Sequence, residues 1–320
     1  MRRGARGRRR GVSLVELMIA LAISLGIVLV AAALMLASNG SYLDHTETAR
    51  LHDNARYALE IVTRAVRQTA YVNWDGALGP VGVSAEEEAP ISGLDARSVN
   101  KNGEGIDSVF DGAVNGSDVL AIRYAGAGTG AAGDGSVINC AGFGVGLAAA
   151  PAERGWSIFY VGTDAAGEAE LRCKYRGQNS WGADAIVRGV DSFQVLYGLD
   201  TDTPRDGVAN QYVNASALNE LDAGMVLSGL NPTERERERR RKTHWKRVVS
   251  IKIALLLHGE PGSGSGTLPE GFDLFGKDYA AAYGASDPGV HVEEQALAPG
   301  LRARARQLIE TTVVLRNRPG

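Results

Sequence analysis

The chain has 320 residues, of which 44% are hydrophobic and 22% are charged, and this length is sufficient for one sizeable globular core or two smaller lobes. Its formal net charge is −3; the first ten residues hold six arginines and no acid, so without them the charge is −9. A chain that acidic is not typical of nucleic-acid-binding proteins, and we expect no nucleic-acid partner.

A long apolar run follows these arginines. No charged side chain occurs from Leu17 to Tyr42, and the core of the run is residues 17–37. Roughly 20 apolar residues are enough to cross a bilayer, whereas a secretory signal peptide has a shorter apolar region and a cleavage site at its far end. The preceding arginines predict a cytoplasmic N-terminus. We therefore expect a single-pass membrane protein in which the chain after the run is translocated.

A carboxylate lies inside the apolar stretch, at Glu16. An ionisable group at the centre of a membrane helix costs roughly 2.5–3.5 kcal/mol, and less near the interface, so a plain membrane anchor does not explain it. A cut between Gly11 and Val12 would create an amino group one helical turn from Glu16. We expect Glu16 to pair with that amino group, in its own chain or in a neighbouring subunit, and to set the axial register of an apolar filament core.

The segment from Gly11 to Met18, Gly-Val-Ser-Leu-Val-Glu-Leu-Met, resembles the prepilin peptidase site of type IV pilins and type II secretion pseudopilins. In that family a basic leader ends in Gly, an apolar residue follows, and a Glu stands at the fifth mature position. The resemblance implies cleavage after Gly11, N-methylation at Val12 and a role for Glu16 in docking onto the growing filament. Val12 stands where most members have Phe, which is a tolerated exchange.

The helix is predicted to continue beyond the membrane. Apolar residues recur at helical spacing from residue 51 to residue 66, charged residues fall largely off that stripe, and no proline occurs between Val12 and Trp74. One helix from about Val12 to about Thr69 would be roughly 85 Å long. We expect its stripe to dock on the protein's own sheet. The stripe consists of Leu51, Ala55, Ala58, Leu59, Val62, Ala65 and Val66.

The remaining sequence predicts mainly strands, after a Gly-, Ser- and acid-rich stretch at 75–116 in which Glu86, Glu87 and Glu88 are expected in a solvated loop. One helix followed by many strands predicts an α+β fold with an antiparallel sheet. The expected regions are a leader at 1–11, a membrane or filament-core half-helix at 12–40, an amphipathic half-helix at 41–72 and a periplasmic domain at 73–320. The predicted strands are 118–124, 157–161, 170–175, 185–197, 247–257 and 309–315.

Phrases in these strands resemble the PilW family of minor pilins. They are G-S-D-V-L-A-I-R-Y at 116–124, V-R-G-V-D-S-F-Q-V-L-Y-G at 187–198, V-V-S-I-K-I-A-L-L at 248–256 and V-V-L-R-N at 313–317, with A-R-L-H-D-N-A-R-Y-A-L-E at 49–60 in the helix. The resemblance implies a type IV pilin-like fold and a low-abundance subunit that primes the filament. Implied partners are major and minor pilins, the prepilin peptidase and the inner-membrane assembly machinery. A type II secretion pseudopilin, or a tip adhesin or DNA-uptake subunit, remains an alternative.

The chain has two cysteines, Cys140 and Cys173. In an oxidising compartment a bond between them would stabilise the fold by roughly 3–4 kcal/mol on the chain-entropy model; the alternative is two unpaired buried thiols. Because the domain is expected outside the cytoplasm, we expect the disulfide.

An acidic, turn-like stretch runs from Asp200 to Gly207. With Asp202 as the first ligand of a calcium loop, Asp206 also fits, but Pro204 occupies a ligand position and Val213 stands where the distal carboxylate belongs. We expect an Asx-rich turn and no metal, with Asp202 and Asp206 as weak candidates.

The other chemical patterns predict no enzyme and no cofactor. The charge run from Glu234 to Lys242 would suit DNA or acidic lipid, but its three acids offset half of its six basic residues, and we expect a solvated loop or short helix. The five histidines show no metal-binding spacing. The Gly-rich stretch at 126–135 lacks the following helix and lysine of a phosphate-binding loop.

Overall fold

A computed structural model describes residues 11, 13–72, 84–178, 180–264 and 271–317. The chain divides into two compact units, residues 1–49 and residues 50–320. Helix α1 (Leu14–Arg67) begins in the first unit and ends in the second, and it continues through Gly26 and Gly40. The prediction of one long helix is therefore confirmed, with its end two residues before the expected Thr69.

In the first unit, residues 14–36 of α1 are long and apolar enough to cross a membrane. Their large apolar side chains are exposed. In the second unit, α1 presents its other half to a core. All seven residues of the predicted apolar stripe are buried there, whereas Asp53, Arg56, Glu60 and Arg64 are exposed. The amphipathic interpretation of this half is confirmed, because the stripe packs against apolar residues of both large sheets.

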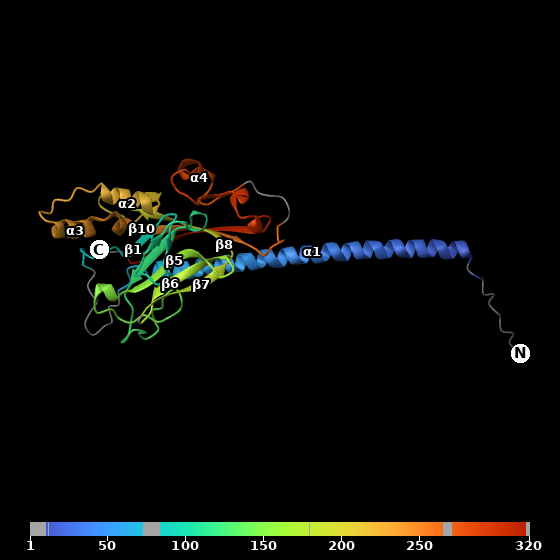
Figure 1. Ribbon diagram of the computed structural model, residues 1–320, viewed down its shortest axis with the longest axis horizontal. Coiled ribbons are helices and arrows are strands. Elements are labelled where there is room, and N and C mark those ends of the chain that lie inside the picture. The colour runs from blue at the N-terminus through green and yellow to red at the C-terminus, as the bar shows by residue number, and fades with distance from the viewer. Residues whose placement is uncertain (1–10, 12, 73–83, 179, 265–270, 318–320) are drawn as a thin grey trace. The chain divides into compact units, whose positions relative to one another are not determined.

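The described part of the second unit contains two large antiparallel sheets (Figure 1). The five-stranded sheet has the order β1-β4-β5-β6-β7, and the four-stranded sheet has the order β13-β10-β8-β9. Every paired strand is antiparallel, as predicted. The strands are β1 (Ile91–Leu94), β4 (Val119–Tyr124), β5 (Gly155–Thr163), β6 (Ala169–Arg176), β7 (Trp181–Arg188), β8 (Val190–Leu199), β9 (Gln211–Val213), β10 (Val248–His258) and β13 (Arg306–Val314).

The smaller elements connect and cover these sheets. Two further sheets have two short strands each. In one, β2 (Ser98–Val99) pairs with β3 (Val109–Phe110), and in the other, β11 (Phe272–Asp273) pairs with β12 (His291–Val292). The further helices are α2 (Ala215–Ala223), α3 (Pro232–Lys242) and α4 (Lys277–Tyr283). The 3-10 turns span Val114–Gly116, Pro151–Glu153, His244–Arg247, Glu294–Ala296 and Pro299–Leu301.

Two strand predictions need correction. The run at 185–197 is two strands, β7 and β8, and they belong to different sheets. Gly189 separates them with a φ of +74°, and a Cβ there would lie 2.6 Å from the backbone oxygen of His258, so a glycine is required. The stretch at 75–116, in which no strand was predicted, contains β1, β2 and β3. Strand β1 was missed because its Gly93 interrupts the apolar alternation; the hydroxyl of Tyr197 occupies the space of the absent side chain.

The core lies between the two sheets and α1. Successive residues along each strand face opposite sides, so Leu120, Phe159 and Ile253 join the central core, whereas Ala121 and Ile158 pack on the outer face of the five-stranded sheet. The outer face of the four-stranded sheet is covered by apolar residues of the segment 272–301, which includes α4. The central strands β4, β5, β8 and β10 are therefore buried on both faces, whereas the edge strands β7, β9 and β13 are partly exposed.

Candidate functional site

The first candidate site is the start of α1, where Ser13 and Glu16 bond each other's backbone. The N–H of Glu16 donates to the hydroxyl of Ser13 at 3.1 Å, and the N–H of Ser13 donates to the Glu16 carboxylate at 2.9 Å. This reciprocal pair is a capping box, which satisfies N–H groups that have no partner within the helix. Sequence reasoning missed the role of Ser13, although Ser-x-x-Glu before an apolar run is the signature of such a cap.

The capping box gives Glu16 a structural role alongside the predicted assembly role. A carboxylate in the first turn of a helix also interacts favourably with the helix dipole. Gly11 is exposed. Val12, the predicted mature N-terminus and methylation site, lies outside the described residues, as do the leader residues 1–10, so the pairing of Glu16 with an amino group stays a prediction.

The membrane-length half of α1 is an unpartnered apolar surface in the single chain. The large apolar residues between Leu14 and Leu36 are each at least 54% exposed. A contiguous apolar surface of this extent marks a contact with lipid or with other protein. This segment is therefore a candidate membrane anchor.

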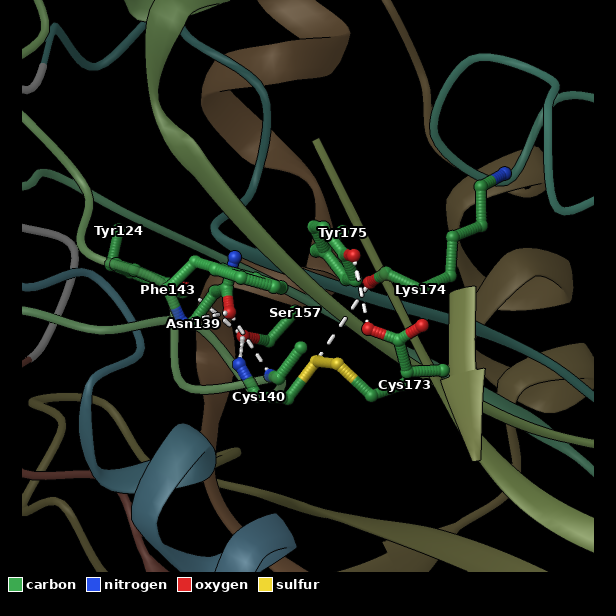
Figure 2. The surroundings of a disulfide bond; sticks show 10 residues. Tyr124, Asn139, Cys140, Phe143, Ser157, Cys173, Lys174 and Tyr175 are labelled. Carbon is green, nitrogen blue, oxygen red and sulfur yellow. Dashed lines mark hydrogen bonds between the residues drawn. A yellow bond between two sulfur atoms is a disulfide. The ribbon is translucent and has the colours of Figure 1, made fainter. Parts of the chain in front are cut away.

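The disulfide is the second candidate site (Figure 2). Cys140 and Cys173 are bonded and buried, with Cα atoms 5.8 Å apart and a sequence separation of 33, which confirms the predicted bond. The N–H of Cys140 donates to the hydroxyl of Ser157 at 3.0 Å, and that hydroxyl also lies 2.9 Å from the Tyr124 hydroxyl. The bond therefore holds the loop around Cys140 against β5 and β6.

The acidic stretch forms a turn that draws its carboxylates together. Those of Asp200, Asp202 and Asp206 lie within 4.8 Å of one another. Asp200 is buried and accepts the N–H groups of Asp202 at 3.2 Å and Gly207 at 2.6 Å, while Asp206 accepts that of Val208 at 2.8 Å. These side-chain to backbone bonds are those of an Asx-rich turn, and they account for two of the three carboxylates without an ion.

The charge run lies in helix α3. Of the two structures expected for this segment, a solvated loop or a short helix, it therefore forms the helix. Asn231 caps it by accepting the N–H of Glu234 at 2.9 Å. Glu236 pairs with Arg239 at 2.6 Å and with Arg240 at 3.1 Å. Such pairs at i, i+3 and i, i+4 stabilise an exposed helix by a few tenths of a kcal/mol each. The arginines are thus partly neutralised within the helix, and the absence of a nucleic-acid partner stays a prediction.

A network of charged residues joins the ends of three strands, and sequence reasoning did not find it. His258 Nδ1 lies 2.8 Å from Asp191 Oδ1, and its Nε2 contacts Glu168; Arg306 donates to Asp191 and to Glu294, each at 2.8 Å. Burial by itself lowers the pKa of His258, but the hydrogen bonds and charges of Asp191 and Glu168 outweigh it, so this pKa is raised. The network joins β8, β10 and β13 where their first or last residues meet.

Comparison with known proteins now adds to this geometry. Residues 158–317 match the family model of PilW, the type IV pilus-assembly protein W. The match runs from within β5 to the residues after β13, and so includes the whole four-stranded sheet and Cys173. No match was found among curated proteins or solved structures. The matched region covers half of the chain, and the chain belongs to the PilW family of type IV pilus-assembly proteins.

Proposed function

We propose that this chain is a minor pilin, which joins other pilins through α1 and helps to prime the type IV pilus. The observation that carries the proposal is the exposed apolar half of α1, residues 14–36, in a chain that belongs to the PilW family. An apolar helix of this length suits a membrane before assembly and a filament core of packed helices afterwards.

The proposed mechanism is assembly without catalysis or a cofactor. Prepilin peptidase cuts between Gly11 and Val12 on the cytoplasmic side of the inner membrane, and the new amino group of Val12 is methylated. The Glu16 carboxylate, which accepts the N–H of Ser13, then pairs with the amino group of Val12 in its own chain or in a neighbouring pilin. This pairing neutralises two charges that an apolar filament core would otherwise exclude.

The globular unit is proposed to lie in the periplasm and, after assembly, at or near the filament tip. The buried disulfide suits an oxidising compartment. The partners are other major and minor pilins and the inner-membrane assembly machinery. The PilW match favours a pilus over a type II secretion system.

The test is complementation of a deletion strain with the wild-type chain, with Glu16→Ala or with Glu60→Ala as the matched control, since Glu60 is an exposed carboxylate on the same helix. Membrane fractionation and counts of surface pili are the two measurements. We expect Glu16→Ala to insert into the membrane normally and to reduce piliation, and Glu60→Ala to behave as wild type. Normal piliation with Glu16→Ala would overturn the role of Glu16.

A further inference from the structure

Strand β13 (Arg306–Val314) is an edge of the four-stranded sheet and pairs with β10 on one side. The two strands stay in register along all nine residues of β13, without a bulge. In an antiparallel pair, alternate residues direct their N–H and C=O groups toward the partner strand, and the residues between them direct theirs away. The N–H of Leu315 donates to the backbone oxygen of Val249, so the odd-numbered residues of β13 bond β10 and the even-numbered residues point outward.

Three outward-pointing residues near the end of β13 have unbonded backbone groups. In the described part of the chain, the N–H and C=O groups of Glu310, Thr312 and Val314 make no hydrogen bond, and all three residues are exposed. Nearer the start of the strand, the side-chain amide of Gln307 donates to the outward backbone oxygen of Leu308 at 2.9 Å. The second half of β13 is therefore open to a further strand, whereas the first half is partly blocked.

This open edge, residues 310–314, lacks the features with which proteins prevent strands from pairing across molecules, such as prolines, lysines, bulges or a very short strand. Its sequence is Glu-Thr-Thr-Val-Val. The one charged side chain, Glu310, pairs with Lys252 of the same sheet at 3.5 Å and accepts the N–H of Phe275 at 3.2 Å. By contrast, the edge strands β1 and β9 have only four and three residues, and β7 has a shift in its register with β6.

Apolar side chains at this edge are incompletely covered. Val314 is 60% exposed. Ile309 packs against the central core but is only partly buried, whereas its partner Leu255 on β10 is fully buried. An added strand would cover both side chains, because its own residues would alternate between the two faces of the sheet. The strand that fits beside Ile309, Thr312 and Val314 is uncharged and rich in β-branched or other apolar residues.

Strand β13 runs beside the half of α1 that docks on the sheets. Just after the strand, the side-chain amide of Asn317 donates to the backbone oxygen of Thr69, beyond the end of α1, at 3.1 Å. At the other end of the strand, Glu260 pairs with Arg50 of α1 at 3.1 Å, and the residue before Glu260 donates its N–H to the residue before β13. A second pilin whose helix packs along this α1 would thus bring its globular unit next to the open edge.

We propose that the open edge binds an extended strand from the globular unit of a neighbouring pilin, which joins the four-stranded sheet as a further strand. Its backbone pairs with the outward N–H and C=O groups of Glu310, Thr312 and Val314. Its apolar side chains cover Ile309 and Val314. The inference rests on the proposed minor pilin function and adds a second contact to the one made by α1. Backbone pairing supplies affinity at this contact, and the apolar side chains select the partner strand.

The test is photo-crosslinking in the complemented deletion strain, with benzoylphenylalanine in place of Thr312. The same probe in place of Phe110 is the control, because Phe110 is 51% exposed and lies on β3, outside the four-stranded sheet. Val314→Pro is the test variant, since proline removes one outward N–H and leaves the bonds from β13 to β10 in place. Val314→Thr keeps that N–H and is its matched control. Val314→Lys is a second test variant, which places a charge against the incoming strand without changing the backbone.

We expect the probe at Thr312 to crosslink to an uncharged strand segment of another pilin, identified by mass spectrometry, and the probe at Phe110 to give no such product. Val314→Pro should lower the yield at least fivefold, and Val314→Thr should leave it unchanged. If the purified Val314→Pro chain has an altered circular dichroism spectrum, Val314→Lys replaces it with the same expectation.

The proposal is overturned if the probe at Thr312 captures no pilin, or captures only lipid, another class of protein, a second copy of this chain or the helix of a pilin. It is also overturned if the folded Val314 variant crosslinks as well as wild type. These failures leave the minor pilin proposal intact, because counts of pili with Glu16→Ala test that proposal separately. Failure of the wild-type chain to restore pili would instead contradict the minor pilin proposal, whatever crosslinks form.

Discussion

Ser13 and Glu16 each accept a hydrogen bond from the other's backbone N–H, so the residue predicted to guide assembly is also part of the cap of α1. The box holds the Glu16 carboxylate against the backbone N–H of residue 13, the second residue of the predicted mature chain. Ser13 is thereby a positioning residue for Glu16.

Replacing Ser13 with Ala should loosen the start of α1. Loss of a side-chain cap costs roughly 0.5–2 kcal/mol, so the amide protons of Glu16 and Leu17 should exchange faster with solvent in detergent micelles. Ser13→Thr keeps a hydroxyl and serves as the control. Unchanged exchange in Ser13→Ala would show that the cap contributes nothing to the start of the helix.

Leu59→Ala should destabilise the second unit by roughly 2–5 kcal/mol, because Leu59 is buried in the core between α1 and the sheets. Glu60→Ala, one residue further along the helix and exposed, should change stability by no more than about 0.5 kcal/mol. Chemical denaturation of the two variants side by side measures the difference. Equal stabilities would contradict the docking of this helix face.

Removal of the disulfide by the Cys140→Ser/Cys173→Ser change should lower the free energy of unfolding by roughly 3–4 kcal/mol, since the bond spans 33 residues. Denaturation with and without a reductant measures this loss. The reductant should destabilise the wild-type chain and leave the double variant unaffected. A reductant effect on the double variant would mean that the loss has another origin.

The stability of the second unit should fall as the pH rises above about 6.5, the ordinary pKa of histidine. The pKa of His258 is raised above its ordinary 6.5 by Asp191 and Glu168 in spite of burial, so the folded state binds this proton more tightly than the unfolded state. The stabilisation is complete below about pH 6.5 and is lost as the pH rises through the folded value. Thermal unfolding across this range should show the decline, and His258→Gln should flatten it. An equally steep decline in the variant would assign it to other groups.

The elements with a periodic apolar pattern could be predicted from the sequence, because the repeat of a helix or a strand determines which side chains are buried. The stripe from Leu51 to Val66 is buried residue for residue, and each of the six predicted strand runs overlaps at least one strand. The break at Gly189 could not be placed, because both flanking segments have strand composition and only the close approach of His258 requires the turn.

The candidate sites were predictable to different degrees. The bond from Cys140 to Cys173 followed from the compartment and the cysteine count. The network of Asp191, His258 and Arg306 did not, because its members are 67 and 115 residues apart in sequence and meet only through the register of β8, β10 and β13.

The most direct measurement is mass spectrometry of the N-terminus of the chain isolated from the cell envelope. The proposed function predicts a mature chain that begins at Val12, with a methyl group on its amino nitrogen and without the eleven leader residues. A chain that keeps Met1, or one cut after the apolar run beyond Ala37, would contradict it.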